Sequence, residues 1–406
     1  MDGEEEKEEK IVVVADDRPW NGMDLLPLDI LIAILSRLPV TSLIQFKRTS
    51  HAGRDLIAHP LLIQAFHNWV SDSNPCLNFF GDYSQLYFLG CDYPKIYSRT
   101  ALRFERTFYS SLSDMVGCCN GLLCVSCHLN SGESAIRSLE IYNPFVGDPV
   151  AIRPEPANRF SNLREVFGFG FHPITRESKV VRIVYYAKIL KLEGRAKCRL
   201  TEKAFQVFTL GTGEWRDKEN IPKRLGLRPP EALVEGSLHW VVVADEGFYY
   251  AIVSFQLADE VFEEIPHPPC QSLVSSRYSL SVLNGCLSAA GLGETAQFDI
   301  WVMKQYKVED SWKKEYSFVP NVPLGLTMKR DSSASGFMNR VPRVVCDLKN
   351  GKILLQYGES TLVSYDPIGN RFKTLEINGQ PSFFQAFPFL PSLFSAKATM
   401  DLQVSS

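Results

Sequence analysis

The sequence has 406 residues, of which 45% are hydrophobic and 22% charged, and its formal net charge is -3. This composition is that of a folded protein with room for more than one domain, and it provides no broad basic surface for nucleic acid. The longest apolar stretch, residues 25–40, is interrupted by Pro27, Asp29, Arg37 and Pro39, so we expect no membrane span.

The chain begins with the acidic run MDGEEEKEEK, and residues 1–22 contain few apolar side chains. We therefore predict a disordered acidic tail over 1–22. The run has neither the basic start nor the apolar centre of a signal peptide. Ten cysteines in a long chain without such a signal are expected to be free thiols. We expect an intracellular protein, in the cytoplasm, the nucleus or both.

Residues 23–70 have the apolar spacing of short helices. In the first, Ile30, Leu31, Ile34, Leu35 and Leu38 fall on one helical face. A second helix is predicted over about 40–47, and further turns over about 54–58 and 61–70, with proline breaks between them. So small a helical unit cannot bury its apolar surface alone. Either the rest of the chain or another protein must cover it.

From residue 75 onward, short runs rich in β-branched and aromatic residues alternate with turn residues, which predicts many short strands. A weak internal repeat is present. Its first half is a turn glycine before an apolar strand, at Asn120-Gly121, Glu235-Gly236, Asn284-Gly285 and Asn350-Gly351. Its second half pairs an aromatic residue with a ring or proline seven positions later, at Tyr142 and Pro149, Phe208 and Trp215, Phe255 and Phe262, and Tyr365 and Phe372.

This repeat predicts an irregular β-propeller of about six blades over residues 75–390, followed by a flexible tail over 391–406. The uneven spacing of the glycines leaves a two-sheet sandwich as an alternative. The fold class is therefore mainly β with a small amino-terminal helical module.

Several residues could suggest chemistry. Metal ligation by the cysteines at 118, 119, 124 and 127 with His128 is disfavoured, because Cys124 and Cys127 point to opposite faces of a strand and paired C-x-x-C knuckles are missing. The glycines of Phe167-Gly168-Phe169-Gly170-Phe171 lack the third glycine of a dinucleotide loop, so strand crowding explains them better.

His239 has no nucleophile motif near it, and the carboxylates at 259–260 and 263–264 are typical of a solvated hairpin tip. We therefore expect no catalytic, cofactor-binding or metal-binding residues, no cofactor, and no enzymatic activity.

The helical segment contains the pattern LPxDILxxILSRLPVxSLxxFK over residues 26–47. This pattern resembles the F-box, whose apolar face inserts into a Skp-type adaptor that is joined to a cullin. The resemblance places adaptor contacts on Leu26, Pro27, Ile30, Ile34, Leu35, Leu38, Pro39, Leu43 and Phe46. One departure is Gly53, which stands where the family has a tryptophan, so adaptor affinity is expected to be weaker or the third helix repacked.

The β-rich region resembles the F-box-associated domain of plants in several stretches, including residues 117–122, 236–240 and 300–306 with Asp310-Ser311-Trp312. This resemblance implies a kelch-like propeller. The two resemblances together imply a substrate-recognition subunit of a Skp-cullin-F-box ubiquitin ligase. It would recruit an unknown target protein for ubiquitination, and its partners would include neither nucleic acid nor membrane. Two alternatives remain: an interaction protein that does not deliver its partner, and a propeller enzyme.

Overall fold

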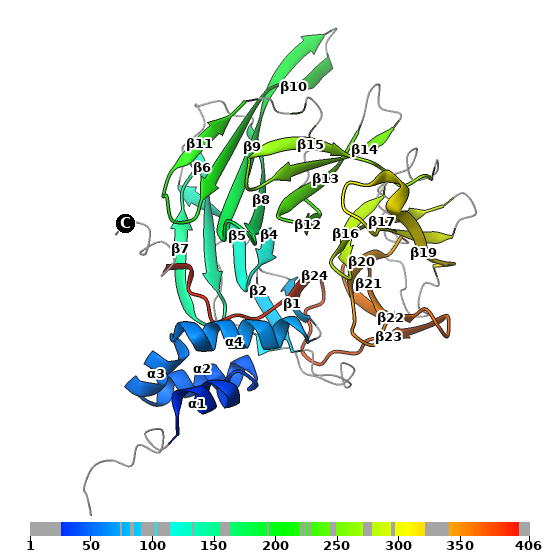
Figure 1. The fold of residues 1–406 in the computed structure, drawn as a ribbon. Coiled ribbons are helices and arrows are strands. Elements are labelled where there is room, and N and C mark those ends of the chain that lie inside the picture. The colour runs from blue at the N-terminus through cyan, green and yellow to red at the C-terminus, as the bar shows by residue number, and fades with distance from the viewer. Residues whose placement is uncertain are drawn as a thin grey trace, which may run out of the picture.

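The strands of this chain form a ring of radiating sheets, and the amino-terminal helices pack against one side of that ring (Figure 1). The structure is a computed structural model. It describes residues 26–73, 75–81, 85–90, 102–103, 114–131, 134–154, 163–192, 195–219, 222, 225, 229–243, 249–270, 278–293, 297–320 and 341–397. Within these residues, six antiparallel sheets of four strands form the blades of a β-propeller. This confirms the predicted fold class.

The helices are α1 (Leu28–Leu35), α2 (Val40–Thr49), α3 (His51–Ile57) and α4 (Pro60–Ser71). The blades are given next, each from its inner to its outer strand. Blade 1 consists of β24 (Phe384–Phe389), β1 (Cys76–Gly81), β2 (Gln85–Leu89) and β3 (Leu102–Arg103); blade 2 of β4 (Asp114–Cys119), β5 (Leu122–Ser131), β6 (Ser134–Asn143) and β7 (Gly147–Ile152); and blade 3 of β8 (Leu163–His172), β9 (Glu177–Leu192), β10 (Arg195–Thr209) and β11 (Trp215–Lys218). Blade 4 consists of β12 (Ala232–Val234), β13 (Ser237–Val243), β14 (Tyr250–Gln256) and β15 (Val261–Ile265); blade 5 of β16 (Ser279–Leu283), β17 (Cys286–Leu292), β18 (Phe298–Met303) and β19 (Trp312–Phe318), with the 3-10 turn η4 (Glu309–Ser311) between its last two strands; and blade 6 of β20 (Arg343–Asp347), β21 (Ile353–Tyr357), β22 (Thr361–Asp366) and β23 (Arg371–Thr374).

The turn glycines of the repeat connect the first two strands of a blade. In blades 2, 4 and 5 the connection is two residues long, and both residues have positive φ, as at Asn120 (48°) and Gly121 (73°). This is the conformation of the type I′ hairpin turn, which asparagine and glycine adopt most readily. Blade 6 differs, because β20 already ends at Asp347 and residues 348–352 form a longer turn in which only Gly351 has positive φ.

The aromatic pairs seven positions apart are cross-strand partners in the outer hairpins of three blades. Phe208 faces Trp215 in blade 3, Phe255 faces Phe262 in blade 4, and Tyr365 faces Phe372 in blade 6. Their ring centroids lie 5.4, 4.9 and 4.8 Å apart respectively, at the distance of favourable aromatic contacts. In blade 2 a register shift after Ile141 prevents the same pairing.

The ring is closed by pairing the two ends of the propeller sequence. β24 lies antiparallel to β1, with Phe389 opposite Cys76 and Phe384 opposite Gly81. The carboxyl-terminal strand is thereby the inner strand of a blade that otherwise comes from the amino-terminal side of the domain. Contacts from β24 to both β4 and β20 complete the circle of inner strands. A two-sheet sandwich is therefore wrong for this chain.

Close packing between strands accounts for the glycines of the FGFGF run on β8. A Cβ added to Gly168 would lie 2.6 Å from Cγ of Pro230 and 2.9 Å from Cγ2 of Val181. At Gly170 the nearest atom would be Cδ1 of Leu257, at 2.7 Å. Both distances are too short for real carbon contacts, so glycine is needed here to let the strand approach its neighbours. This confirms the expectation of strand crowding.

The hairpin tip of blade 4 holds a buried ion cluster, where the sequence predicted solvated carboxylates. The Glu260 side chain is 6% exposed and receives Nζ of Lys179 at 2.9 Å, Nη2 of Arg216 at 2.6 Å and Nζ of Lys218 at 2.5 Å. All three cations belong to blade 3. The prediction of a solvated tip is wrong for Glu260, because the turn packs against blade 3 and the Glu260 carboxylate forms ion pairs with that blade.

Candidate adaptor-binding site

Local signals at each helix start explain why residues 28–71 fold into four short helices. Pro27 and Pro39 precede α1 and α2, and Pro60 opens α4. Proline suits these positions because the first turn of a helix needs no N–H donor from it. Ser50 caps α3, since its Oγ accepts the N–H of Gly53 at 2.9 Å. The breaks therefore lie close to the predicted boundaries.

Five of the nine residues predicted to contact the adaptor are exposed. Ile34 is 50% exposed, and Leu26 and Ile30 are each 43% exposed. Pro27 and Pro39 are also exposed. Ile30 and Ile34 stand four residues apart on α1 and so share a face of the helix.

Leu28 is 43% exposed as well, but it stands two residues before Ile30 on α1 and so does not share the face of Ile30 and Ile34. We call Leu26, Ile30 and Ile34 the exposed α1 strip. So much uncovered aliphatic surface on one short helix is typical of a protein-binding site.

The other four predicted residues face the protein interior. Leu35 is 7% exposed and Leu43 is fully buried. Leu38 and Phe46 are partly buried and pack on the same cluster. These residues stabilise the helices, so a charge at Leu35 would unfold the segment rather than report on adaptor docking. The informative substitutions are those in the exposed α1 strip.

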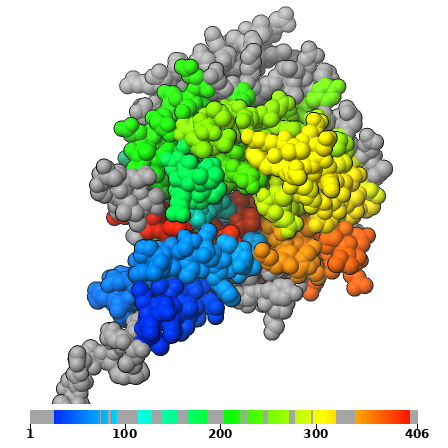
Figure 2. Space-filling view, viewed as in Figure 1, coloured from blue at the N-terminus to red at the C-terminus, as the bar shows by residue number. Residues whose placement is uncertain are grey.

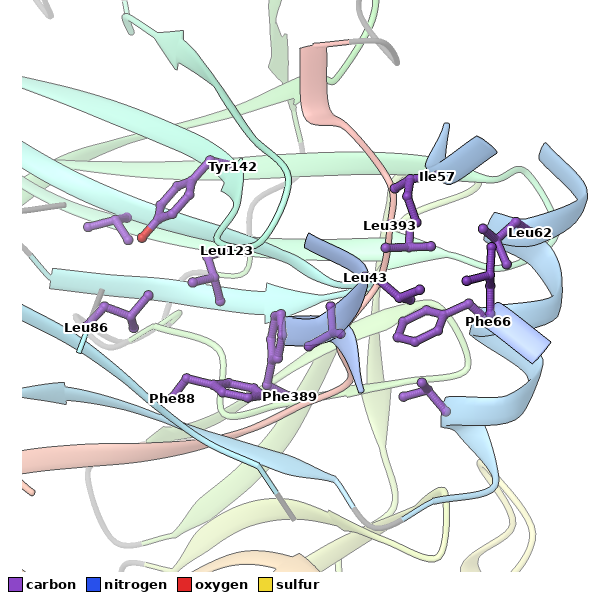
Figure 3. Close-up of a cluster of buried hydrophobic side chains, with 14 of the residues drawn as sticks. Leu43, Ile57, Leu62, Phe66, Leu86, Phe88, Leu123, Tyr142, Phe389 and Leu393 are labelled. Atoms are coloured by element: carbon purple, nitrogen blue, oxygen red, sulfur yellow. The ribbon is translucent and has the colours of Figure 1, made fainter. Parts of the chain in front are cut away.

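The buried cluster under the helices continues into the propeller. Leu43, Leu62 and Phe66 from the helices share it with Leu123 of β5 and Phe389 of β24 (Figure 3). A shared core of this kind makes the helices and the propeller one packed unit, since neither part can leave without exposing apolar surface. Figure 2 shows the helices lying directly against the blades.

The segment after β24 lies between the helices and blade 2. Asn143 Nδ2 donates to the carbonyl oxygens of Ser392 and Phe394, both at 2.8 Å. Leu393 is 4% exposed and belongs to the shared cluster, and the Phe394 ring lies 6.4 Å from that of His67 on α4. Residues 391–397 are thus packed, in contrast to the flexible tail predicted from residue 391. The predicted tails at 1–22 and 398–406 lie outside the described residues.

Gly53 is buried at the contact between α2 and α3. A Cβ at this position would lie 2.9 Å from the backbone oxygen of Phe46 and 3.1 Å from Oγ of Ser50. The tryptophan that the family has here would not fit without moving one helix. Glycine therefore lets α2 and α3 pack closely here, and weaker adaptor affinity or a repacked third helix stays a prediction.

A second apolar area on α4 was not anticipated from the sequence. Trp69 is 48% exposed and carries Arg37 over its ring, with the guanidinium carbon 5.6 Å from the ring centroid. Leu61, at the start of α4, is 59% exposed. Arg37 follows α1, so this cation–π pair ties the end of α1 to α4.

The cysteines considered as metal ligands are packed in blade 2. Burial raises the pKa of the Cys118 thiol to about 12, and Cys124 is shifted upward for the same reason. The Cys118 thiol donates to the carbonyl of Pro388 at 3.1 Å. The side chain of His128 lies outside the described part. Among the described residues, no group of three or more His, Cys, Asp or Glu could hold a metal ion.

His239 lies fully buried on β13. Its Nε2 is 2.9 Å from the hydroxyl of Tyr306, and burial lowers its pKa to about 4. A neutral imidazole hydrogen-bonded to a tyrosine between blades 4 and 5 stabilises their packing.

Comparison with known families agrees with both halves of this architecture. Residues 23–63 match the F-box domain, and residues 77–382 match the F-box associated beta propeller domain. Among curated proteins, F-box protein At3g07870 of Arabidopsis thaliana is 35% identical over 94% of each chain. F-box protein CPR1 of the same plant is 25% identical over 91% of this chain and 89% of its own. In the described residues, no helix is long and apolar enough to cross a membrane.

The chain thus combines a helical segment that bears an exposed apolar strip with a closed six-bladed propeller. The chain belongs to the F-box proteins that carry an F-box-associated β-propeller. Such proteins have in general a substrate-recognition role in ubiquitin ligases.

Proposed function

We propose that this chain is the substrate-recognition subunit of a Skp-cullin-F-box ubiquitin ligase and that it takes no chemical step itself. The observation that carries the proposal is the exposed α1 strip. Its residues remain 43–50% exposed although the opposite side of the same helices is buried against the propeller. A Skp-type adaptor would cover this strip by the helix-in-groove mode.

The exposed apolar surface of the helical segment is large enough to support a complex. Full burial of a leucine or isoleucine contributes about 1.5–3 kcal/mol, so covering the exposed half of one contributes about 1 kcal/mol. Three such residues, with Pro27, Pro39 and Trp69 available at the rim, could offset about 3 kcal/mol of the cost of association.

The shared core supports a positional mechanism. Because Leu43 and Phe66 pack in one cluster with Phe389 and Leu393, a target bound to the propeller would keep a fixed orientation to the adaptor. Holding a target lysine near an activated ubiquitin raises its effective concentration and accelerates transfer without a catalytic residue in this chain.

The proposal is tested by measuring the affinity of the purified chain for a purified Skp-type adaptor by calorimetry. Ile34→Glu places a charge in the centre of the strip, and burying that unpaired charge should weaken binding by at least about 100-fold. Ile368→Glu is the matched control, because Ile368 is 98% exposed in the turn between β22 and β23. Equal affinity for the wild-type and a folded Ile34→Glu protein would contradict the proposed adaptor contact.

A further inference from the structure

A hollow of about 560 Å³ lies between blades 6 and 1. It is lined by strand ends and the turns next to them, from β1, β20, β21 and β24. Its lining includes Phe80, Arg343, Gln356, Glu359 and Phe383. The volume is that of a site for a side chain or a short ligand.

The hollow lies at the end of the blades that points away from the helices. β1 begins at Cys76, which packs on the helical cluster, and ends at Gly81, which lines the hollow. β24 runs the other way, from Phe384 at the hollow to Phe389 at the helices. Six residues of strand separate the two ends by roughly 17 Å. A ligand here would not collide with an adaptor bound to the exposed α1 strip.

The hollow contains one positively charged side chain, that of Arg343. Arg343 Nη2 donates to Oε1 of Gln356 at 2.8 Å and to the carbonyl oxygen of Ala386. The guanidinium carbon also lies 5.8 Å from the ring centroid of Phe387. Among the described residues this guanidinium makes no ion pair within 4 Å, and its Nε and Nη1 donate to no described group, while the carboxylate of Glu231 acts on it from a longer distance.

The guanidinium is held rigidly by its neighbours. Gln356 is 3% exposed and is itself fixed, because its Nε2 donates to the carbonyl of Phe384 at 2.7 Å and its Oε1 accepts the N–H of Ala386 at 3.1 Å. Burial lowers the pKa of Arg343 to about 10, so it stays charged at neutral pH. An immobilised, partly desolvated cation is a strong partner for an anion.

The walls of the hollow combine aromatic and polar side chains, with three phenylalanines beside two glutamines and Glu359. Phe383 is 52% exposed, which is unusual for a phenylalanine, and Phe80 is only partly buried. Gly358 has positive φ, and a Cβ built there would meet nothing within 4 Å, so there is open space beside it. Phenylalanine rings beside a fixed cation favour a ligand that carries one negative group next to apolar atoms.

We propose that this hollow receives a single carboxylate of the target protein, with an adjacent apolar side chain against Phe383 and Phe80. The inference deepens the proposed function, on which it rests, by naming the chemistry of the target. Arg343 supplies the charge-assisted hydrogen bonds through Nε and Nη1. The carboxylate can come from an aspartate or glutamate side chain or from a chain terminus. Glu359 at the rim disfavours segments with several consecutive acidic residues, since its own carboxylate repels them.

The test uses the full chain and three fluorescein-labelled peptides of one length, read by fluorescence anisotropy. The first contains a single aspartate beside a phenylalanine and an amidated terminus, the second has asparagine in place of the aspartate, and the third is the asparagine peptide with a free terminal carboxylate. We expect the aspartate peptide or the peptide with the free terminus to bind about 10- to 100-fold more tightly than the amidated asparagine peptide. Tighter binding of the aspartate peptide would identify a side-chain carboxylate as the ligand, and tighter binding of the free-terminus peptide would identify a terminal carboxylate.

Variants then assign the effect to the hollow. Arg343→Gln should remove the preference for the carboxylate, and Arg343→Lys should restore part of it. Glu359→Gln should tighten binding of the acidic peptide. Arg371→Gln, at an exposed arginine that begins β23, is the matched control and should change nothing. If Arg343→Gln does not fold, Phe383→Ala, at an exposed position, takes its place and should weaken both carboxylate peptides.

Equal binding of all three peptides, no binding at about 1 mM, or a carboxylate preference that survives in folded Arg343→Gln would each overturn the inference. Adaptor affinity is measured on the same proteins and should be the same for wild type and Arg343→Gln. Loss of peptide recognition with retained adaptor binding would refute only the role of the hollow. A wild-type protein that binds acidic peptides but no adaptor would refute the proposed function and leave the hollow intact.

Discussion

Replacing Leu43 by alanine is expected to destabilise the helices without touching the exposed α1 strip. Leu43 is fully buried and packs in one cluster with Leu62 and Phe66 of α4. Truncating a buried leucine costs about 2–5 kcal/mol, and a site closed on two sides by helices and propeller cannot collapse easily, so we expect about 3 kcal/mol. That is a large part of the 5–15 kcal/mol that stabilises a typical domain.

The assay is urea denaturation followed by circular dichroism in the helical region, with adaptor affinity measured on the same samples. Leu61→Ala is the matched control, because Leu61 is 59% exposed and the same truncation should cost only about 0.5 kcal/mol. Leu43→Ala should lower the denaturation midpoint while the folded fraction keeps its adaptor affinity. A cost below about 1 kcal/mol at Leu43 would refute the shared core.

Three further predictions concern stability. Glu260→Gln should cost about 3 kcal/mol, because it leaves three cations of blade 3 without their buried carboxylate. Burial alone would raise the pKa of Glu260, but hydrogen bonds from those cations lower it to about 2. The stability of the wild-type protein should therefore fall as the pH drops from about 4.3 to 2, and Glu260→Gln should lack this part of the pH dependence. Equal slopes of stability against pH for the two proteins in acid denaturation would contradict the ion cluster. Gly53→Ala should lower the melting temperature, because the added methyl group overpacks against the Phe46 carbonyl at a cost of about 1–3 kcal/mol. The better helix propensity of alanine offsets roughly 1 kcal/mol of this cost. A higher melting temperature would show that α2 and α3 can separate freely. Asn143→Ala should release residues 391–397, seen as faster proteolysis near the carboxyl terminus, and unchanged cleavage would mean that apolar contacts alone hold the segment.

The sequence predicted the propeller well because its signals are local. A turn asparagine and glycine such as Asn284-Gly285 mark one hairpin, and a pair seven positions apart such as Phe255 and Phe262 marks another. Both depend only on the turn length and on the side-chain period of two along a strand. The propeller is closed by pairing of β24 with β1, which joins the two ends of the domain, so no local sequence pattern predicts it.

The candidate site was predicted as a set of residues but not as a surface. Ile34 and Leu35 are adjacent on the same helix, and helical spacing cannot say which one meets the propeller and which one meets solvent. The answer depends on Leu393 and Phe389, which are more than 340 residues away. Glu260 was misread for a similar reason, because its cations come from another blade.

The hollow around Arg343 had no signal in the sequence. Its lining comes from four strands and their turns, and its key arginine has no motif around it. What marks Arg343 is the combination of a buried guanidinium, a fixed glutamine and an exposed phenylalanine, which exists only after folding.

In the proposed function, the exposed α1 strip connects the propeller's partner to ubiquitin transfer. The most direct measurement is the ratio of ubiquitinated to unmodified partner captured from plant cells with the proteasome blocked, compared between the intact chain and Ile34→Glu. The account predicts that both proteins capture the partner and that the ubiquitinated fraction collapses with Ile34→Glu. An unchanged ubiquitinated fraction would contradict it.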